Sequence, residues 1–310
     1  MKLYFAVLTG ADETPDLLSS CIQYTQFMRL SRGNVVDSLC DTVADRQRTK
    51  RAFWFLYCIE KEFCLRAEIC PILDEDFVDY RPPQLEVSPG AVDWLFIRCC
   101  YASLCTAILK GFYGQKSLKA EGQNLVNNLE AQLNAWLRLL PPGIQSIDEQ
   151  MVEFPSLNDW QERRKKLTVF FQYHAVFLTL HTGRRSQHPP SSSCSSEFPG
   201  IEPWALDTSR KSAAAVRRIL AASCQLTESD VRLDPSMYRL VCIATCSLAA
   251  ATIRTPLAGH RTDLSYLATA AGFFGRMALA NIEGPLEEIT EIVRIAQQHI
   301  KARQQDMATD

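Results

Sequence analysis

The feature that most constrains the fold is an apolar run, Ala52-Phe53-Trp54-Phe55-Leu56-Tyr57-Cys58-Ile59. In a helix these eight residues leave no polar face, and a helix that is apolar all round has to be covered by other elements. Charge returns at Glu60-Lys61-Glu62, and the chain then leaves through Pro71 toward Pro82-Pro83. We therefore predict one buried helix of roughly six turns that ends near Glu68 in a stiff loop.

The order of residues in this region carries a family resemblance. A basic pair, Lys50-Arg51, is followed by Phe53-Trp54, by the aliphatic and aromatic run, by the acidic Asp74-Glu75-Asp76 and by a closing proline. This order resembles the central motif of the fungal-specific transcription factor regulatory domain, the middle homology region of binuclear zinc cluster regulators. The resemblance implies a structural role for the motif residues Arg51, Phe53, Trp54, Tyr57, Asp74 and Asp76.

The same resemblance continues more loosely through most of the chain. Tyr173-His174 ahead of Leu178 and His181 is similar to a helix of that family. One departure is that Ala67-Glu68-Ile69 stands where the family usually has Gly-Arg-Pro. The family implies an all-helical regulatory domain, usually C-terminal to a six-cysteine zinc module that binds DNA.

The remaining periodicity is helical. The apolar residues of 118–140 recur at three-, four- and seven-residue spacing until Pro141-Pro142-Gly143, and similar stripes recur to residue 300. No stretch alternates with the period of two that a half-buried strand requires. We predict an all-α fold, an irregular multi-helix bundle of about nine helices without a sheet. Residues 1–310 are expected to form a single helical regulatory domain with a truncated start, a Ser/Pro-rich internal loop at 183–203 and a frayed tail at 301–310.

Composition limits the classes of partner. The 310 residues carry a formal net charge of -2, whereas a self-sufficient nucleic-acid-binding domain is usually clearly basic. The 12 cysteines include no Cys-x-x-Cys pair, so we predict no zinc cluster and interpret them as reduced core residues. The apolar stretch Leu240 to Ile253 is shorter than the roughly 20 residues that span a membrane, which predicts a buried helix and no membrane partner.

The sequence contains no catalytic signature. Phosphate loops, nucleophile elbows and His-Glu-x-x-His motifs are all missing, which predicts no enzyme activity and no cofactor or metal. His174 and His181 share a helix face and are either a metal or proton-relay pair or histidines hydrogen-bonded at a helix interface, lining a pocket or a contact surface. We favour the second interpretation, because no carboxylate lies at a helical offset from them. For Asp74, Glu75 and Asp76 we likewise favour solvation or capping over cation binding.

The basic clusters have two interpretations each. Arg163-Arg164-Lys165-Lys166 and Arg184-Arg185 are either a nuclear import address or phosphate contact, or charges that keep a helix face soluble, and we favour the latter. We interpret Arg217-Arg218 as the polar side of its helix. For Arg51 we hypothesise an ion pair with Asp76 or Asp79 that fixes the acidic loop on the helix.

These observations favour the regulatory, ligand- or partner-responsive part of a nuclear fungal transcription factor that controls a metabolic or biosynthetic gene set. The expected partners are a small-molecule effector and a protein partner or a second copy of the chain. Specific DNA binding is expected only through a missing zinc cluster module or a partner. The alternative is an orphan helical domain recruited as an enzyme or metabolite-binding protein, with a pocket between helices.

Overall fold

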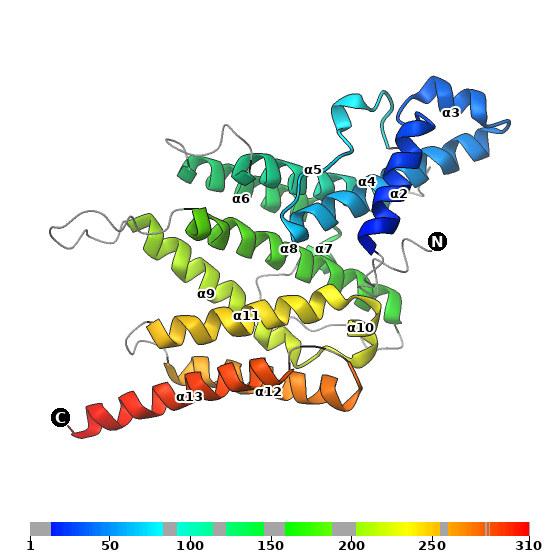
Figure 1. Ribbon diagram of the computed structural model, residues 1–310. Helices are drawn as coiled ribbons and strands as arrows, with labels where there is room; N and C mark the ends of the chain where they lie inside the picture. The colour runs from blue at the N-terminus through cyan, green and yellow to red at the C-terminus, as the bar shows by residue number, and fades with distance from the viewer. Residues whose placement is uncertain are drawn as a thin grey trace. The chain divides into compact units, whose positions relative to one another are not determined.

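A computed structural model of the chain describes residues 14–82, 92–113, 122–145, 159–187, 203–254, 260–282, 284 and 286–309. These residues contain twelve α-helices, labelled α2 to α13, and no strand (Figure 1). The prediction of an all-α fold is confirmed, although the count of about nine was low. The missed helices include the short α7 and α10.

The chain divides into two compact units, Met1–Gln145 and Ser146–Asp310, which we describe separately. Unit 1 contains α2 (Thr14–Phe27), α3 (Gly33–Leu39), α4 (Val43–Ala67), a short 3-10 helix η1 (Glu75–Phe77), α5 (Trp94–Tyr113), α6 (Gly122–Arg138) and α7 (Pro142–Gln145). Unit 2 contains α8 (Trp160–Gln187), α9 (Pro203–Ser223), α10 (Glu228–Leu233), α11 (Pro235–Arg254), α12 (His260–Leu279) and α13 (Leu286–Thr309).

Helix α4 is the predicted central helix. It begins at the N-cap Thr42, whose side chain accepts a hydrogen bond from the Asp45 backbone N–H at 3.0 Å, and it ends where Glu68 adopts a left-handed conformation. Asp45 lies in the first turn of the helix and accepts a hydrogen bond from the Thr42 hydroxyl at 2.7 Å.

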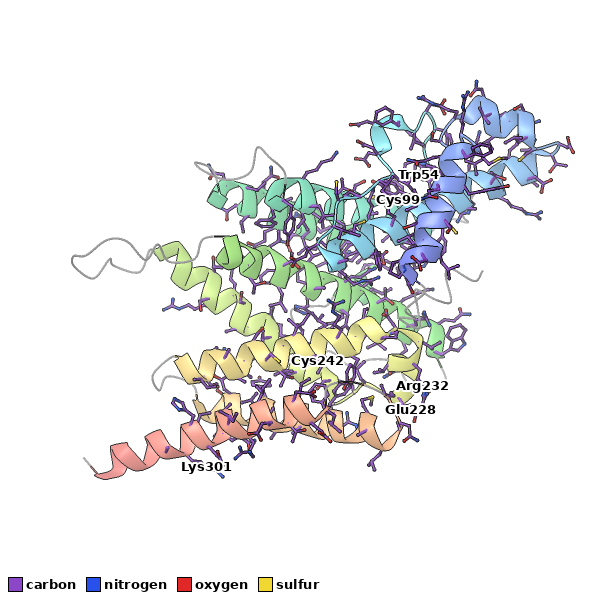
Figure 2. All side chains as sticks on the ribbon, in the orientation of Figure 1. Trp54, Cys99, Glu228, Arg232, Cys242 and Lys301 are labelled. Carbon is purple, nitrogen blue, oxygen red and sulfur yellow. The ribbon has the colours of Figure 1, made fainter. Side chains whose placement is uncertain are left out.

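The core of unit 1 forms around α4. Phe53, Trp54, Tyr57, Cys58 and Ile59 are all buried, as predicted from the apolar run. Figure 2 shows Trp54 on α4 and Cys99 on the neighbouring α5, and the Cys58 and Cys99 sulfurs approach to 3.6 Å. Helix α5 is in turn covered by α6, where the Trp136 indole donates to the Ile97 carbonyl at 3.1 Å.

Unit 2 is organised on α9, which packs against α8, α11 and α12, while α13 covers α11 and α12. Its core includes the aromatic trio Tyr238, Phe273 and Phe274, with ring centroids 5.2 to 5.8 Å apart. The short α10 is stabilised at its start by a reciprocal capping box between Thr227 and Asp230. On its surface Glu228 and Arg232, labelled in Figure 2, form an exposed ion pair at 2.8 Å.

Several predicted segments fall wholly or partly outside the described residues. The N-terminal start and most of the 183–203 loop lie there, although α8 continues to Gln187 and α9 begins at Pro203. Helix α13 extends to Thr309, through the segment for which we expect fraying. The single domain, the loop and the frayed tail remain predictions.

Two helices among the described residues are long and apolar enough to cross a membrane, α5 and the stretch Pro235–Ile253 of α11. The uncharged stretch Leu240 to Ile253 that we counted is shorter than this candidate span of α11, which begins at Pro235 and includes Arg239. In the structure 61% of the α5 stretch and 44% of the α11 stretch are buried, and core helices often have this composition. The absence of a membrane partner therefore stays a prediction.

Candidate functional site

The first element of the candidate site is a buried ion pair on α4. The Lys61 ammonium lies 2.9 Å from the Glu60 carboxylate, and each side chain is only 1% exposed. Glu60 accepts the backbone N–H groups of Ile72 at 2.5 Å and Leu73 at 2.9 Å, and Lys61 donates to the Leu73 carbonyl. This pair therefore attaches the loop after α4 to the helix, and its burial was not predicted from the sequence.

A second contact joins the same loop to α4 and α5. Glu75, in η1, accepts hydrogen bonds from the Tyr57 hydroxyl and the Ser103 hydroxyl, both at 2.9 Å. Burial, together with the nearby Glu75 carboxylate, raises the pKa of Tyr57 and keeps its hydroxyl protonated as a donor. The acidic loop is thus held against two helices.

The predicted motif residues have distinct roles in the structure. The Arg51 guanidinium pairs with Asp93 at 3.8 Å, rather than showing the hypothesised ion pair with Asp76 or Asp79, while Asp79 accepts the Gly33 backbone N–H at 2.6 Å. Asp74 caps η1, accepting from the Asp76 backbone N–H at 3.2 Å, and lies 4.0 Å from Lys110. Among the described residues no group of three potential metal ligands comes together, at this loop or elsewhere.

The aromatic residues of the motif form one cluster. The Trp54 ring lies edge-on to Phe53 and Tyr57, with centroids 5.9 and 5.1 Å apart, and Tyr80 from the loop packs against both Phe53 and Trp54. The Tyr80 hydroxyl donates to the Leu30 carbonyl at 2.5 Å, so the turn after α2 is tied to the same cluster. Leu18 and Ile22 of α2 belong to the same buried core as these rings.

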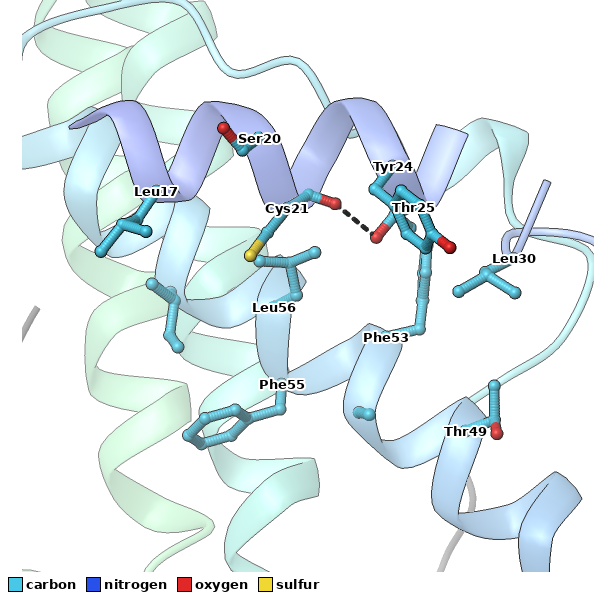
Figure 3. Close-up of a pocket in the computed structure, with 12 residues that line it drawn as sticks. Leu17, Ser20, Cys21, Tyr24, Thr25, Leu30, Thr49, Phe53, Phe55 and Leu56 are labelled. Atoms are coloured by element: carbon cyan, nitrogen blue, oxygen red, sulfur yellow. Dashed lines mark hydrogen bonds between the residues drawn. The ribbon is translucent and has the colours of Figure 1, made fainter. Parts of the chain in front are cut away.

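An open groove of about 650 Å³ lies between α2 and α4 (Figure 3). Leu17, Cys21 and Tyr24 line it from α2, opposite a wall of α4. The other lining residues are Ser20, Thr25, Leu30, Thr49, Ala52, Phe53, Phe55, Leu56 and Ile59. The apolar residues of α2 recur at helical spacing in the sequence, but this spacing does not show that part of the stripe is left uncovered.

The groove is left open because the stripe that α2 buries in the core is not the stripe of Leu17, Cys21 and Tyr24 that lines the groove. Leu18 and Ile22 insert into the core around α4, whereas Tyr24 is 66% exposed and Phe27, one turn on, is 82% exposed. The hydroxyl of Thr25 is used within α2, donating to the Cys21 carbonyl at 2.7 Å. An amphipathic face is therefore available beside the motif helix.

His174 and His181 are buried in unit 2, on the same helix, α8, as predicted. The His174 ring lies 4.4 Å from Phe170 and 5.3 Å from Tyr173, and neither of its nitrogens has a hydrogen-bond partner among the described residues. Burial, reinforced by the positive charge of Arg218, lowers its pKa to about 3. His174 is thus a neutral interior ring, and the expected hydrogen bond at a helix interface is not found for it.

The basic clusters contain two structural arginines that the sequence did not reveal. Arg163 is buried and donates to Asp230 at 3.1 and 2.5 Å and to the Gln225 carbonyl at 2.8 Å. Arg217, which we had interpreted as a surface residue, holds Asp263 of α12 at 2.7 and 3.2 Å. Burial tends to raise the pKa of Asp230, but its hydrogen bonds from Arg163 and Thr227 outweigh burial and lower it.

The cysteines of the described residues are all free thiols. Burial raises the pKa of Cys64 to about 12, and contact with Cys99 followed by burial raises that of Cys58. The raised pKa values keep Cys58 and Cys64 as unreactive thiols, in agreement with their interpretation as core residues, whereas Cys70 and Cys224 are exposed and that interpretation is wrong for them.

The fold and the site define an all-helical domain whose motif helix is bordered by an apolar groove. Three relatives give that class a context. The chain is 26% identical over 325 residues to the fumonisin cluster-specific transcription factor of Gibberella moniliformis, covering 94% of this chain and 47% of the relative. It is 25% identical over 253 residues to the AAl-toxin cluster-specific transcription factor of Alternaria alternata, covering 76% and 36%. The AM-toxin biosynthesis protein 12 of Alternaria alternata is 24% identical over 307 residues, covering 94% and 83%.

These similarities confirm the predicted resemblance to the regulatory domain of fungal transcription factors. The chain spans half or less of the length of the two cluster-specific transcription factors. No family model and no solved structure matches it.

Proposed function

We propose that residues 1–310 are the regulatory part of a fungal transcription factor that controls a biosynthetic gene cluster in the nucleus. The observation that carries this proposal is the similarity, along 94% of the chain, to a factor named for the cluster that it regulates. The site supports it, because a groove beside a rigid motif helix is a suitable place for an effector or partner. The chain acts on transcription by binding, with no chemical turnover.

In this proposal the chain does not bind DNA specifically by itself. Its formal net charge of -2 offers no basic footprint for the phosphate backbone, so sequence-specific contacts come from a zinc cluster module or from a partner. A protein partner or a second copy of the chain brings the regulatory surface to the promoter.

The test is genetic and uses the native gene. Deleting it in the source organism should lower the transcripts of a neighbouring set of biosynthetic genes, and reintroducing it should restore them. A fluorescent fusion should accumulate in the nucleus, and the purified chain should fail to shift promoter DNA in a gel assay. Unchanged transcripts in the deletion strain would contradict the proposal.

The alternative is a metabolite-binding protein or enzyme of a biosynthetic pathway. The similarity to a protein named only for its part in AM-toxin biosynthesis favours keeping it as a second candidate. It predicts unchanged cluster transcripts in the deletion strain, together with accumulation of a pathway intermediate and turnover of that intermediate by the purified chain.

A further inference from the structure

The groove between α2 and α4 has a lining of one chemical character. None of its twelve lining residues carries a charge, and most are aliphatic or aromatic. A charged group held against this lining would give up part of its hydration without meeting a counter-charge, so a charged ligand is disfavoured. The lining is thus complementary to an uncharged, mainly apolar molecule.

The polar groups of the groove are few and lie mainly along its α2 side. Thr25 donates to Cys21, and the Thr49 hydroxyl lies 3.4 Å from the Cys40 sulfur, so these two groups have partners in the protein. The hydroxyls of Ser20 and Tyr24 have no hydrogen-bond partner among the described residues. In Figure 3 the Ser20 oxygen lies at the outer edge of the groove and points away from α4, whereas Phe53, Phe55 and Leu56 lie on α4. The two hydroxyls can give a ligand one or two hydrogen bonds along the α2 edge while its body lies on these three side chains.

The volume of the groove indicates the size of the molecule that it can hold. Its volume of about 650 Å³ lies within the roughly 300–1,000 Å³ of pockets that hold a small molecule. Its floor is preorganised, because Phe53 belongs to the aromatic cluster that Tyr80 and Trp54 fix in place. A rigid apolar floor lowers the ordering cost of binding.

We propose that this groove binds an uncharged, largely apolar small molecule that carries one or two hydrogen-bonding groups, directed to Ser20 and Tyr24. This proposal specifies the chemical class of the effector in the proposed function. That the ligand regulates transcription rests on that function. Binding itself is a property of the chain and is measured without transcription.

The experiment uses the full chain and two neighbouring serines. Ser20 lines the groove, whereas Ser19, also exposed on α2, does not. Nile red, a neutral apolar dye, should bind with a saturable rise in fluorescence. Ser20→Trp, which fills the groove, should weaken its binding by about tenfold or more, which corresponds to about 1.4 kcal/mol. Ser19→Trp should leave the affinity for Nile red within about twofold of the native value.

A second variant fills the groove from the other helix. Ala52→Phe, on α4, should weaken Nile red binding as Ser20→Trp does. Circular dichroism shows whether each variant keeps its helices.

Competition then tests the chemical class. 1-Dodecanol should displace Nile red, whereas dodecanoate and dodecylammonium, below their micelle concentrations, should need about tenfold more. Equal displacement by the three would overturn the uncharged class, and equal effects of the two serine variants, or no saturable binding, would overturn the site. A concentration-dependent dimer that Ser20→Trp dissolves in sedimentation would instead assign the groove to a second copy. The transcripts of the deletion strain test the regulatory role separately. Failure of Nile red binding would therefore overturn the ligand site but not the regulatory role, and unchanged transcripts would overturn the regulatory role but not the ligand site.

Discussion

Glu60 and Lys61 form an ion pair 2.9 Å long inside unit 1, with each side chain 1% exposed. Adjacent residues of a helix rarely pair so closely, and here both side chains turn to the backbone of Ile72 and Leu73. The pair therefore fixes the path of the chain at the exit of the motif helix. Its hydrogen bonds to backbone groups offset part of the cost of burying two charges.

Removing one partner of this pair should destabilise the chain. Lys61→Met leaves the Glu60 carboxylate buried without its counter-charge, and we expect a loss of about 3–5 kcal/mol in the free energy of unfolding. Glu60→Leu should cost as much or more, because it also leaves the N–H groups of Ile72 and Leu73 without an acceptor. Urea unfolding measures both.

The matched control for these variants is the exposed pair Glu228 and Arg232. Glu228→Ala should leave the midpoint of unfolding close to that of the native chain, because exposed pairs contribute little. A Lys61→Met variant as stable as Glu228→Ala would show that the buried pair has no structural role. Limited proteolysis adds a local readout, since cleavage between residues 69 and 80 should accelerate in Lys61→Met and not in the control.

Arg163 and Arg164 are neighbours in one basic cluster but should respond differently to substitution. Arg163→Ala leaves Asp230 buried without its guanidinium and removes the bond to the Gln225 carbonyl, which should cost about 3–5 kcal/mol. Arg164→Ala, at a partly exposed position, should change the free energy of unfolding by less than about 0.5 kcal/mol. Equal losses in urea unfolding would contradict the structural role of Arg163.

The sequence predicted what depends on local pattern. The apolar run of α4 has no polar face, so the burial of most of residues 52–59 followed from the sequence alone, but Ala52 is exposed and Phe55 is half-buried beside the groove. The burial of Glu60, Lys61 and Arg163 and the ion pair of the half-buried Arg217 did not follow. The groups on other segments that bind these side chains lie 12 to 67 residues away, and a charged residue is ordinarily expected on the solvent-exposed surface. Hydrophobic periodicity shows which face of a helix is buried, but it does not identify the residues that pack against that face.

The sequence pattern also did not predict the details of side-chain packing. The pattern does not show which glycine has a close neighbour, and a side-chain carbon added at Gly272 would meet nothing within 4 Å. The close approach lies at Gly284 instead. The groove beside α2 could not be predicted either. Its presence depends on which of two adjacent stripes of α2 is buried in the core, Leu18 with Ile22 or Leu17 with Cys21.

His174 should make stability depend on pH. Its pKa is lowered to about 3 in the folded chain and is near 6.5 when unfolded, so between these values the unfolded state binds more protons. The stability contributed by the neutral ring is therefore complete above pH 6.5 and is lost as the pH falls toward 3. At about 1.4 kcal/mol per pKa unit, the loss by pH 4 should reach a few kcal/mol.

His174→Phe tests this titration. Phenylalanine keeps an aromatic ring against Phe170 and Tyr173 but cannot bind a proton, so the variant should lose less stability than the native chain between pH 7 and pH 4. Urea unfolding at several pH values gives the difference curve, in which titrations common to both proteins cancel. Parallel curves for the two proteins would show that His174 does not titrate in this range.

Gly284 should not tolerate a side chain. A Cβ atom at this position would clash with the Tyr238 hydroxyl oxygen and lie 2.6 Å from the Tyr238 ring, closer than real Cβ contacts allow. Since Tyr238 packs edge-on against Phe274 in the core of unit 2, it has little room to retreat, and Gly284→Ala should cost about 1–3 kcal/mol. Gly275→Ala, in open space on α12, is the matched control and should raise stability by about 0.5–1 kcal/mol, because alanine suits a helix interior better. Thermal unfolding of the two variants should therefore shift in opposite directions, and a Gly284→Ala variant as stable as the native chain would show that Tyr238 can move aside.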